Sequence, residues 1–261
     1  MPTVIQTDPP HPARETLPTM YDLPSEEVGE SGMPDEFHFR QASLLWETFQ
    51  PLSVSPDQVF SAIDLYLYYD LRHTSWYKRP DWFGVIGVPR MYEGRDFRLS
   101  YVMWQERVAP LIVVEFLAPE SDEGELAQPR GEADEPPTKW EVYERILRVP
   151  YYAVFGRQET ELRIFQLCDE RYSEITGHGG RFWIAEAELG LGLWQGSYNR
   201  YERLWLRWFD AQGNWIPTAD ERVTQEQLRV EHAEQAAEQE RRRAERLAKL
   251  LRQLGQDPDK L

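Results

Sequence analysis

Residues 111–117 read Leu-Ile-Val-Val-Glu-Phe-Leu, an apolar run interrupted by a single acid, Glu115. A continuous run of this length predicts a β-strand covered on both faces, because a strand with one wet face alternates apolar and polar residues. Burying an unpaired carboxylate in such a strand is costly, so Glu115 needs a cation, a hydrogen-bond donor or exposure at the end of the sheet. The alternatives are a salt bridge to Arg79, Arg107 or Lys139, and a divalent metal ion, which takes carboxylate oxygens.

The segments around this run predict a sheet of mixed strand direction. Aromatic and apolar content predicts further strands at residues 82–88, 97–104, 151–155 and 161–168, and a strand, or a short helix running into one, at residues 59–69. A helix is predicted at residues 139–148, where Thr138 can cap the first turn and Pro150 ends the helix. The order strand, helix, strand implies a crossover connection, so the expected α/β fold has a sheet that is at least partly parallel.

Changes in composition divide the chain into three parts. Residues 1–35 are rich in Pro, Asp and Glu without periodicity, which predicts a weakly ordered N-terminal arm. Residues 36–217 carry the predicted strands and form the expected main domain. Within it, the acidic stretch at residues 119–137 is long for a loop in a compact domain, and such loops are often lids or disordered. Residues 218–261 are expected to form a long C-terminal helix of coiled-coil character.

The C-terminal part contains a heptad seam. Ten residues from Val223 to Leu254 are spaced alternately by three and four, and eight of them are apolar. The pattern predicts one long helix over about residues 218–253. It is interpreted either as a single solvated helix or as a helix that pairs, with a second copy in a homodimer or with another partner.

The composition indicates a cytoplasmic protein. Its 261 residues, 41% of them hydrophobic, suffice for one sizeable domain with appendages. A single cysteine, Cys168, excludes an internal disulfide and suits a reducing compartment. The sequence shows neither a membrane-spanning apolar run nor a secretory signal. The net charge of -16 argues against a protein that coats DNA, but is compatible with a nuclease whose basic residues gather in one cleft.

Three residues far apart in the sequence form a candidate catalytic set. Asp81 follows Pro80 at the start of a predicted strand, Glu115 lies in the apolar run, and Lys139 begins the predicted helix. Two carboxylates at the ends of adjacent strands can hold a divalent cation, and an ammonium beside them can orient water. Taken singly, Asp81 is equally explained as a turn former, Glu115 as half of a salt bridge, and Lys139 as a surface charge.

Several other residues are candidate accessories. On the predicted helix at residues 36–50, Glu36 and His38 could add a ligand or a proton carrier, or be a helix-start charge and a surface imidazole. Tyr143 shares a helical face with Lys139. A basic and aromatic patch near Asp81 could contact phosphate and stack a base, or be an ordinary surface loop. Its candidate nucleic-acid contacts are Arg72, Trp76, Lys78 and Arg79.

Four pieces of the sequence resemble the Uma-type restriction endonuclease family, a branch of the PD-(D/E)XK nuclease superfamily. They are Pro80-Asp81, residues 113–121 (VVEFLAPES), residues 139–143 (KWEVY) and residues 149–155 (VPYYAVF). Their order, spacing and flanking residue types agree over about residues 64–167. The resemblance implies a restriction-endonuclease-like fold, in which helices flank a mixed central sheet.

By this resemblance, Asp81 and Glu115 ligate Mg2+ or Mn2+, and the backbone carbonyl of Phe116 can coordinate the same ion. Lys139 would orient the attacking water or stabilise charge on the phosphate. The superfamily's usual Glu-x-Lys is absent, because Leu117 occupies the position of the lysine. Lys139 on the helix replaces it, since the chemistry depends on where the ammonium lies in space.

Three functions follow as hypotheses. The first is a metal-dependent endonuclease that hydrolyses DNA. The second is a catalytically inactive nuclease-fold protein that acts as an interaction scaffold through its C-terminal helix, which the acidic charge and the absent Glu-x-Lys favour. The third is an enzyme that uses the same site on a different phosphoester.

Overall fold

The computed structural model describes residues 14–25, 33, 35–117, 135–156 and 162–253. These fall into two compact units, Met1–Ile216 and Pro217–Leu261. The acidic stretch predicted as a long loop lies almost entirely outside the described residues, as does most of the predicted N-terminal arm. None of the helices in the described ranges combines the length and apolar content that a membrane crossing requires.

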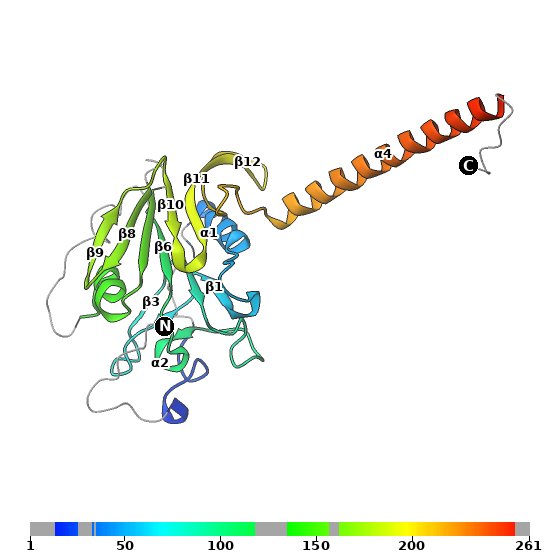
Figure 1. The fold of residues 1–261 in the computed structure, drawn as a ribbon. Helices are drawn as coiled ribbons and strands as arrows, with labels where there is room; N and C mark the ends of the chain where they lie inside the picture. The colour runs from blue at the N-terminus through cyan, green and yellow to red at the C-terminus, as the bar shows by residue number, and fades with distance from the viewer. Residues whose placement is uncertain (1–13, 26–32, 34, 118–134, 157–161, 254–261) are drawn as a thin grey trace. The chain divides into compact units, whose positions relative to one another are not determined.

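A six-stranded sheet forms the centre of the first unit (Figure 1). In spatial order its strands are β1 (Val59–Ile63), β4 (Trp82–Ile86), β6 (Ile112–Leu117), β7 (Tyr151–Gly156), β8 (Leu162–Cys168) and β9 (Arg171–Ile175). The pair β6 and β7 is parallel, and all other neighbours are antiparallel. The predicted mixed sheet is therefore confirmed, with the apolar run at its centre.

Two three-stranded sheets accompany the central one. The first has the order β10 (Arg181–Ile184), β11 (Leu189–Tyr198) and β12 (Tyr201–Phe209), and the second has the order β3 (Tyr77–Lys78), β2 (Leu67–Tyr68) and β5 (Tyr101–Val102). The short helical turns are η1 (Arg14–Thr16) and η2 (Pro56–Gln58), which precede β1, and α2 (Met103–Glu106) and η4 (Ala185–Ala187), which lie between strands. The longer helices of the first unit are α1 (Glu36–Thr48) and α3 (Lys139–Glu141), which continues as the π-helix η3 (Val142–Ile146).

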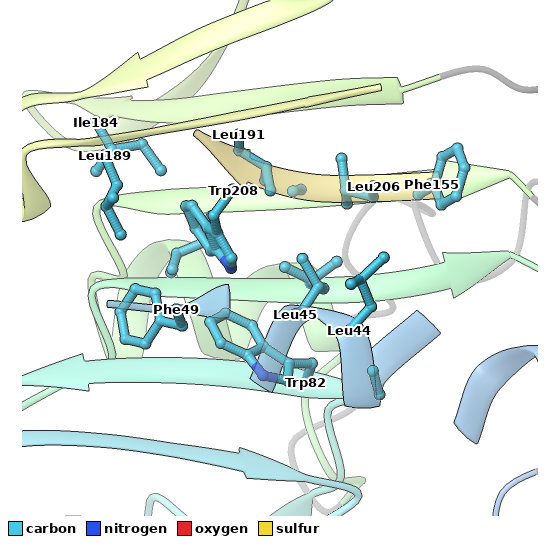
Figure 2. Close-up of a cluster of buried hydrophobic side chains, with 14 of the residues drawn as sticks. Leu44, Leu45, Phe49, Trp82, Phe155, Ile184, Leu189, Leu191, Leu206 and Trp208 are labelled. Carbon is cyan, nitrogen blue, oxygen red and sulfur yellow. The ribbon is translucent and has the colours of Figure 1, made fainter. Parts of the chain in front are cut away.

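The two faces of the central sheet are buried in separate apolar clusters. Alternation along β6 sends Ile112, Val114 and Phe116 into the α1-side cluster, which contains α1 and strands β10 to β12. Figure 2 shows this cluster, in which Phe49 lies against Trp82 and Trp208 with ring centroids 5.1 Å away in both cases. Burying side chains of this size stabilises the fold by about 1.5–3 kcal/mol each.

The opposite face of the sheet carries the α3-side cluster. It contains Val113 of β6, Phe83 of β4, and Tyr143 of η3. Helix α3 begins in a capping box, in which the Thr138 hydroxyl accepts the Glu141 N–H and the Glu141 carboxylate accepts the Thr138 N–H. The helix that starts here is thereby held against the face of the sheet to which Glu115 belongs.

Two sequence expectations differ from the structure. Residues 97–104 do not form one strand, because β5 takes only Tyr101–Val102 before α2 begins. Arg98 turns inward instead and donates to the Glu106 carboxylate at 2.8 Å and to the Pro89 carbonyl at 3.0 Å. The strand predicted over residues 59–69 is two strands, because Asp64 adopts a left-handed conformation (φ 54°) between them.

The described stretch of residues 14–25, which falls in the predicted arm, packs on the first unit. Leu17 and Met20 are 8% and 1% exposed. Trp104 donates its indole N–H to the Pro18 carbonyl at 2.7 Å, and Tyr68 donates its hydroxyl to the Pro24 carbonyl at 2.6 Å. This Pro-rich segment thus packs through its apolar side chains and its backbone carbonyls. Its sequence has no periodicity from which these contacts could be predicted.

The second unit contains α4 (Ala219–Gln253), which confirms the predicted long helix. Thr218 caps its first turn, where the Thr218 hydroxyl accepts the Glu221 N–H and the Glu221 carboxylate accepts the Thr218 N–H. Ion pairs one turn apart along the helix, such as Arg242 with Glu238, line its surface.

Candidate active site

The strand register places Asp81 opposite Glu115. Trp82 of β4 pairs with Val114 of β6 in an antiparallel register. Asp81, one residue before Trp82, therefore lies opposite Glu115, one residue after Val114. Phe83 and Val113, two residues from each acid, lie in the α3-side cluster, and alternation therefore puts both carboxylates on that same face. The Asp81 N–H donates to Glu115 Oε2 at 3.4 Å, which joins the two residues directly.

Glu115 is fully buried and receives donors from the helix above it. Lys139 Nζ lies 3.1 Å from Oε2, and the Tyr143 hydroxyl donates to Oε1 at 2.9 Å. Because Lys139 and Tyr143 are four residues apart, both reach down from one face of the helix. The ammonium and the phenol together offset the cost of burying this carboxylate.

Tyr143 acts as a fixed hydrogen-bond donor. Burial raises the pKa of its hydroxyl well above the usual value, and the negative charge of Glu115 raises that pKa further. The phenol therefore keeps its proton throughout the physiological range and can only orient the carboxylate, not exchange a proton with it.

The backbone N–H and the backbone carbonyl of Phe116 each contact a side chain. Its N–H donates to Asp81 Oδ2 at 2.6 Å, and its carbonyl oxygen lies 3.1 Å from His38 Nε2. Asp35, the residue that caps α1, holds the other ring nitrogen of His38, with Oδ1 2.9 Å from Nδ1. His38 is 2% exposed, so it is a buried site neighbour and not a surface imidazole.

Glu36 lies outside this group. Its carboxylate accepts from Arg40 Nη2 at 2.6 Å and from the Tyr201 hydroxyl at 3.0 Å. Glu36 and His38 occupy different faces of α1, since residues two apart on a helix do not face the same way. Sequence proximity alone had grouped them.

The predicted nucleic-acid contacts have different partners in the structure. Arg79 donates to the Asp64 carboxylate at 2.5 Å and stabilises the turn between β1 and β2. Arg72 has a side chain that is 82% exposed, and the ring of Trp76 stacks on His73 with centroids 3.8 Å apart. Arg79 thus helps to hold this turn, the side chain of Arg72 is exposed, and Trp76 is half-buried against the α3-side cluster.

Lys78, on β3, is affected by the charges of the candidate site. Burial lowers the pKa of its ammonium, and the positive charge of Lys139 lowers that pKa further. The negative charges of Glu115 and Glu141 act in the opposite direction. The charges of Lys139 and Glu115 thus both act on Lys78, although only Lys139 is in direct contact with Glu115 among the contacts described above.

The two kinds of charge acting on Lys78 lead to opposite expected shifts. Lys139→Met should raise the pKa of Lys78 because it removes a neighbouring positive charge, and Glu115→Gln should lower it because it removes a negative one. The lysine side-chain carbon signals followed by NMR across alkaline pH measure both. Arg163→Gln on β8 is the control, because Arg163 does not contribute to the Lys78 shift. Shifts of the same sign in the two variants would contradict this arrangement.

The site can supply oxygen ligands to a small divalent cation, and one of these ligands is a backbone carbonyl. Among the described residues, no three side chains of His, Cys, Asp or Glu gather closely enough to hold a metal ion by themselves. Two carboxylates and the Phe116 carbonyl supply three oxygen donors, which suits Mg2+ or Mn2+, since Mg2+ usually binds one or two carboxylates and keeps several waters. The residues present therefore fit such an ion if the carbonyl takes part.

Sequence reasoning missed the role of Asp35. Its signal was available locally, because an Asp three residues before a His at a helix start can cap the helix and hold that imidazole as well. The contact of His38 with Phe116, 78 residues away, had no local signal.

A comparison with models of protein families gives a match that covers most of the chain. The model of the Uma2 family, described as "Putative restriction endonuclease", matches residues 12–199. No curated protein matches the chain.

Proposed function

The chain belongs to the Uma2 family of restriction-endonuclease-like proteins, and from this membership we propose that it is a metal-dependent endonuclease that hydrolyses phosphodiester bonds of DNA. The observation that supports the proposal most is the convergence on Glu115. A buried carboxylate opposite a second acid, with an ammonium 3.1 Å away, is the equipment that this reaction needs.

In the proposed reaction, Asp81, Glu115 and the Phe116 carbonyl would hold Mg2+ or Mn2+. The bound ion would activate a water molecule and stabilise the charge that develops on the phosphate. Lys139 orients that water or compensates charge on the phosphate oxygens from its position beside Glu115. Tyr143 keeps the Glu115 carboxylate in one orientation.

The DNA backbone would be bound by positive charge concentrated at the site. Lys139 would supply this charge in contact with Glu115, Lys78 would add a second ammonium within range of the same charges, and Arg72 and Trp76 would offer a guanidinium and an aromatic ring. Local charge of this kind is required because the chain as a whole carries a net charge of -16.

Plasmid cleavage tests the proposal. The protein should nick or linearise DNA when Mg2+ or Mn2+ is present and not when EDTA is added, and Asp81→Ala should remove the activity because it deletes one of the two carboxylates. Gel electrophoresis over time measures the rate. Asp57→Ala is the matched control, since Asp57 is an exposed acid on η2. Equal cleavage by wild type and Asp81→Ala would contradict the proposal.

We further propose that α4 pairs with α4 of a second copy, which would suit paired cuts in the two DNA strands. Along the heptad seam, Val223, Val230 and Leu247 are 57%, 46% and 52% exposed in the single chain. Apolar side chains repeated at this spacing pair well with an identical helix.

Sedimentation of two charge variants tests this pairing. Val230→Glu places a charge in the proposed seam and should weaken dimerisation by roughly a hundredfold or more, because an unpaired charge is costly to bury. Leu228→Glu is the matched control, because Leu228 is 50% exposed but lies off the seam. A monomeric wild type, or equal weakening by both variants, would contradict the homodimer.

The alternative function is a catalytically inactive protein that binds partners through α4. The absent Glu-x-Lys favours it, since Leu117 stands where the superfamily has a lysine. A folded protein that neither binds Mn2+ in calorimetry nor cleaves DNA would support this alternative.

A further inference from the structure

The Phe116 peptide lies where the pairing of β4 with β6 breaks down. Continuing the register from Trp82 and Val114 by two positions sets Pro80 opposite Phe116. Proline has no N–H, so Pro80 cannot donate to the Phe116 carbonyl as a residue of an antiparallel strand would. A buried backbone carbonyl needs another partner.

Side chains take over both backbone groups of Phe116. Asp81 Oδ2 accepts the N–H at 2.6 Å, and His38 Nε2 lies 3.1 Å from the carbonyl oxygen. A carbonyl oxygen only accepts hydrogen bonds, so Nε2 carries the proton and donates. The backbone of the residue that follows Glu115 is thereby held between Asp81, at the start of β4, and His38 of α1.

The ring of His38 is itself held in place. Asp35 Oδ1 accepts the backbone N–H of His38 at 3.0 Å and contacts ring Nδ1 at 2.9 Å. The rings of Phe37 and Phe116 pack edge-on against the imidazole, with centroids 5.8 and 5.7 Å away. One carboxylate therefore fixes both the start of α1 and the orientation of the imidazole.

We propose that Asp35 and His38 form a positioning pair that replaces the strand partner Pro80 cannot provide and so sets the orientation of the Phe116 carbonyl. A carbonyl oxygen has two lone pairs, so one can accept from His38 while the other faces a cation. Asp81 and Glu115 are the two acidic side chains that the described part of the chain brings together here, so this carbonyl would be the third protein donor. The metal-binding consequence rests on the proposed function, whereas the clamping of the peptide does not.

Two variants of similar size separate a positioning role from a packing role. His38→Gln keeps an N–H donor, and His38→Met fills the same space without one. In metal-free protein, hydrogen exchange of the Phe116 amide should become at least about tenfold faster in His38→Met and remain near wild type in His38→Gln, because loss of the clamp loosens the whole peptide. In calorimetry, His38→Met should weaken Mn2+ binding by about 10- to 100-fold.

A rescue and a control complete the test. Adding Pro80→Ala to His38→Met returns a backbone donor opposite Phe116 and should restore slow exchange of its amide. Gln41→Leu is the control, because Gln41 is buried on the same helix but forms its hydrogen bonds with the backbone of Leu206 on β12. This change should lower the melting temperature and alter neither Phe116 exchange nor Mn2+ affinity.

The outcomes separate this inference from the proposed function. Unchanged Phe116 exchange in His38→Met, or an equal effect of Gln41→Leu, overturns the positioning role. A wild-type protein that binds no Mn2+ contradicts the metal-dependent nuclease, and the exchange measurements then decide the positioning role by themselves.

Discussion

Glu115→Gln is expected to weaken Mn2+ binding by about a hundredfold and to lower metal-dependent cleavage by about a thousandfold, since a metal ion supplies several kcal/mol of charge stabilisation and each 1.36 kcal/mol is a factor of ten. Glutamine has the shape of glutamate and can still accept hydrogen bonds from Tyr143. It lacks the negative charge that pairs with Lys139 at 3.1 Å and that would attract the cation. The change thus tests charge more than packing.

Glu144→Gln provides the matched control for this variant. Glu144 is also a buried glutamate, 3% exposed, one residue after Tyr143. Its carboxylate accepts the Tyr172 N–H at 2.8 Å and belongs to the β9 side of η3, not to the acidic pair. Calorimetry and plasmid cleavage should show near wild-type behaviour for Glu144→Gln. Loss of activity in both variants to the same extent would mean that the effect comes from a damaged fold.

Lys139→Met is expected to lower the cleavage rate by about a hundredfold to a thousandfold, the cost of removing one preorganised group that stabilises transition-state charge. Its effect on metal affinity should have the opposite sign. The Lys139 ammonium competes with a cation for Glu115 Oε2, so Mn2+ should bind more tightly once the lysine is gone. Calorimetry and single-turnover cleavage measure the two quantities separately.

The position of Leu117 allows a rescue of that variant. Leu117 lies two residues after Glu115 on β6 and packs against the α3-side cluster, so it shares the face of the carboxylate. Leu117→Lys combined with Lys139→Met places an ammonium on the strand instead of the helix. The double variant should cleave at least about tenfold faster than Lys139→Met, because the reaction depends on where the ammonium lies and not on which residue carries it. Leu117→Met in the same background should recover nothing. Rescue by both substitutions, or by neither, would contradict the role assigned to Lys139.

The fold was largely predictable because strand signals are local. The apolar runs around Val113 and Val154 indicate strands buried on both faces, and they pair in parallel at the centre of the sheet. The strand predicted at residues 97–104 failed because Arg98 folds back onto Glu106, a contact that hydropathy does not encode. The family assignment from the sequence motifs is confirmed by the match over residues 12–199.

The sequence by itself determined which chemical groups the site can contain. An acid in a buried strand, a Pro-Asp pair at a strand start and a lysine behind a helix cap are each visible in a few consecutive residues. Only the tertiary structure decided how these groups are held. Tyr143 forms a hydrogen bond with Glu115, His38 with the carbonyl of Phe116, and Arg79 with Asp64. The physical reason is range, because strand and helix patterns arise between neighbours in sequence, whereas these hydrogen bonds join residues 15 to 78 positions apart and exist only once the packed faces of the sheet bring them together.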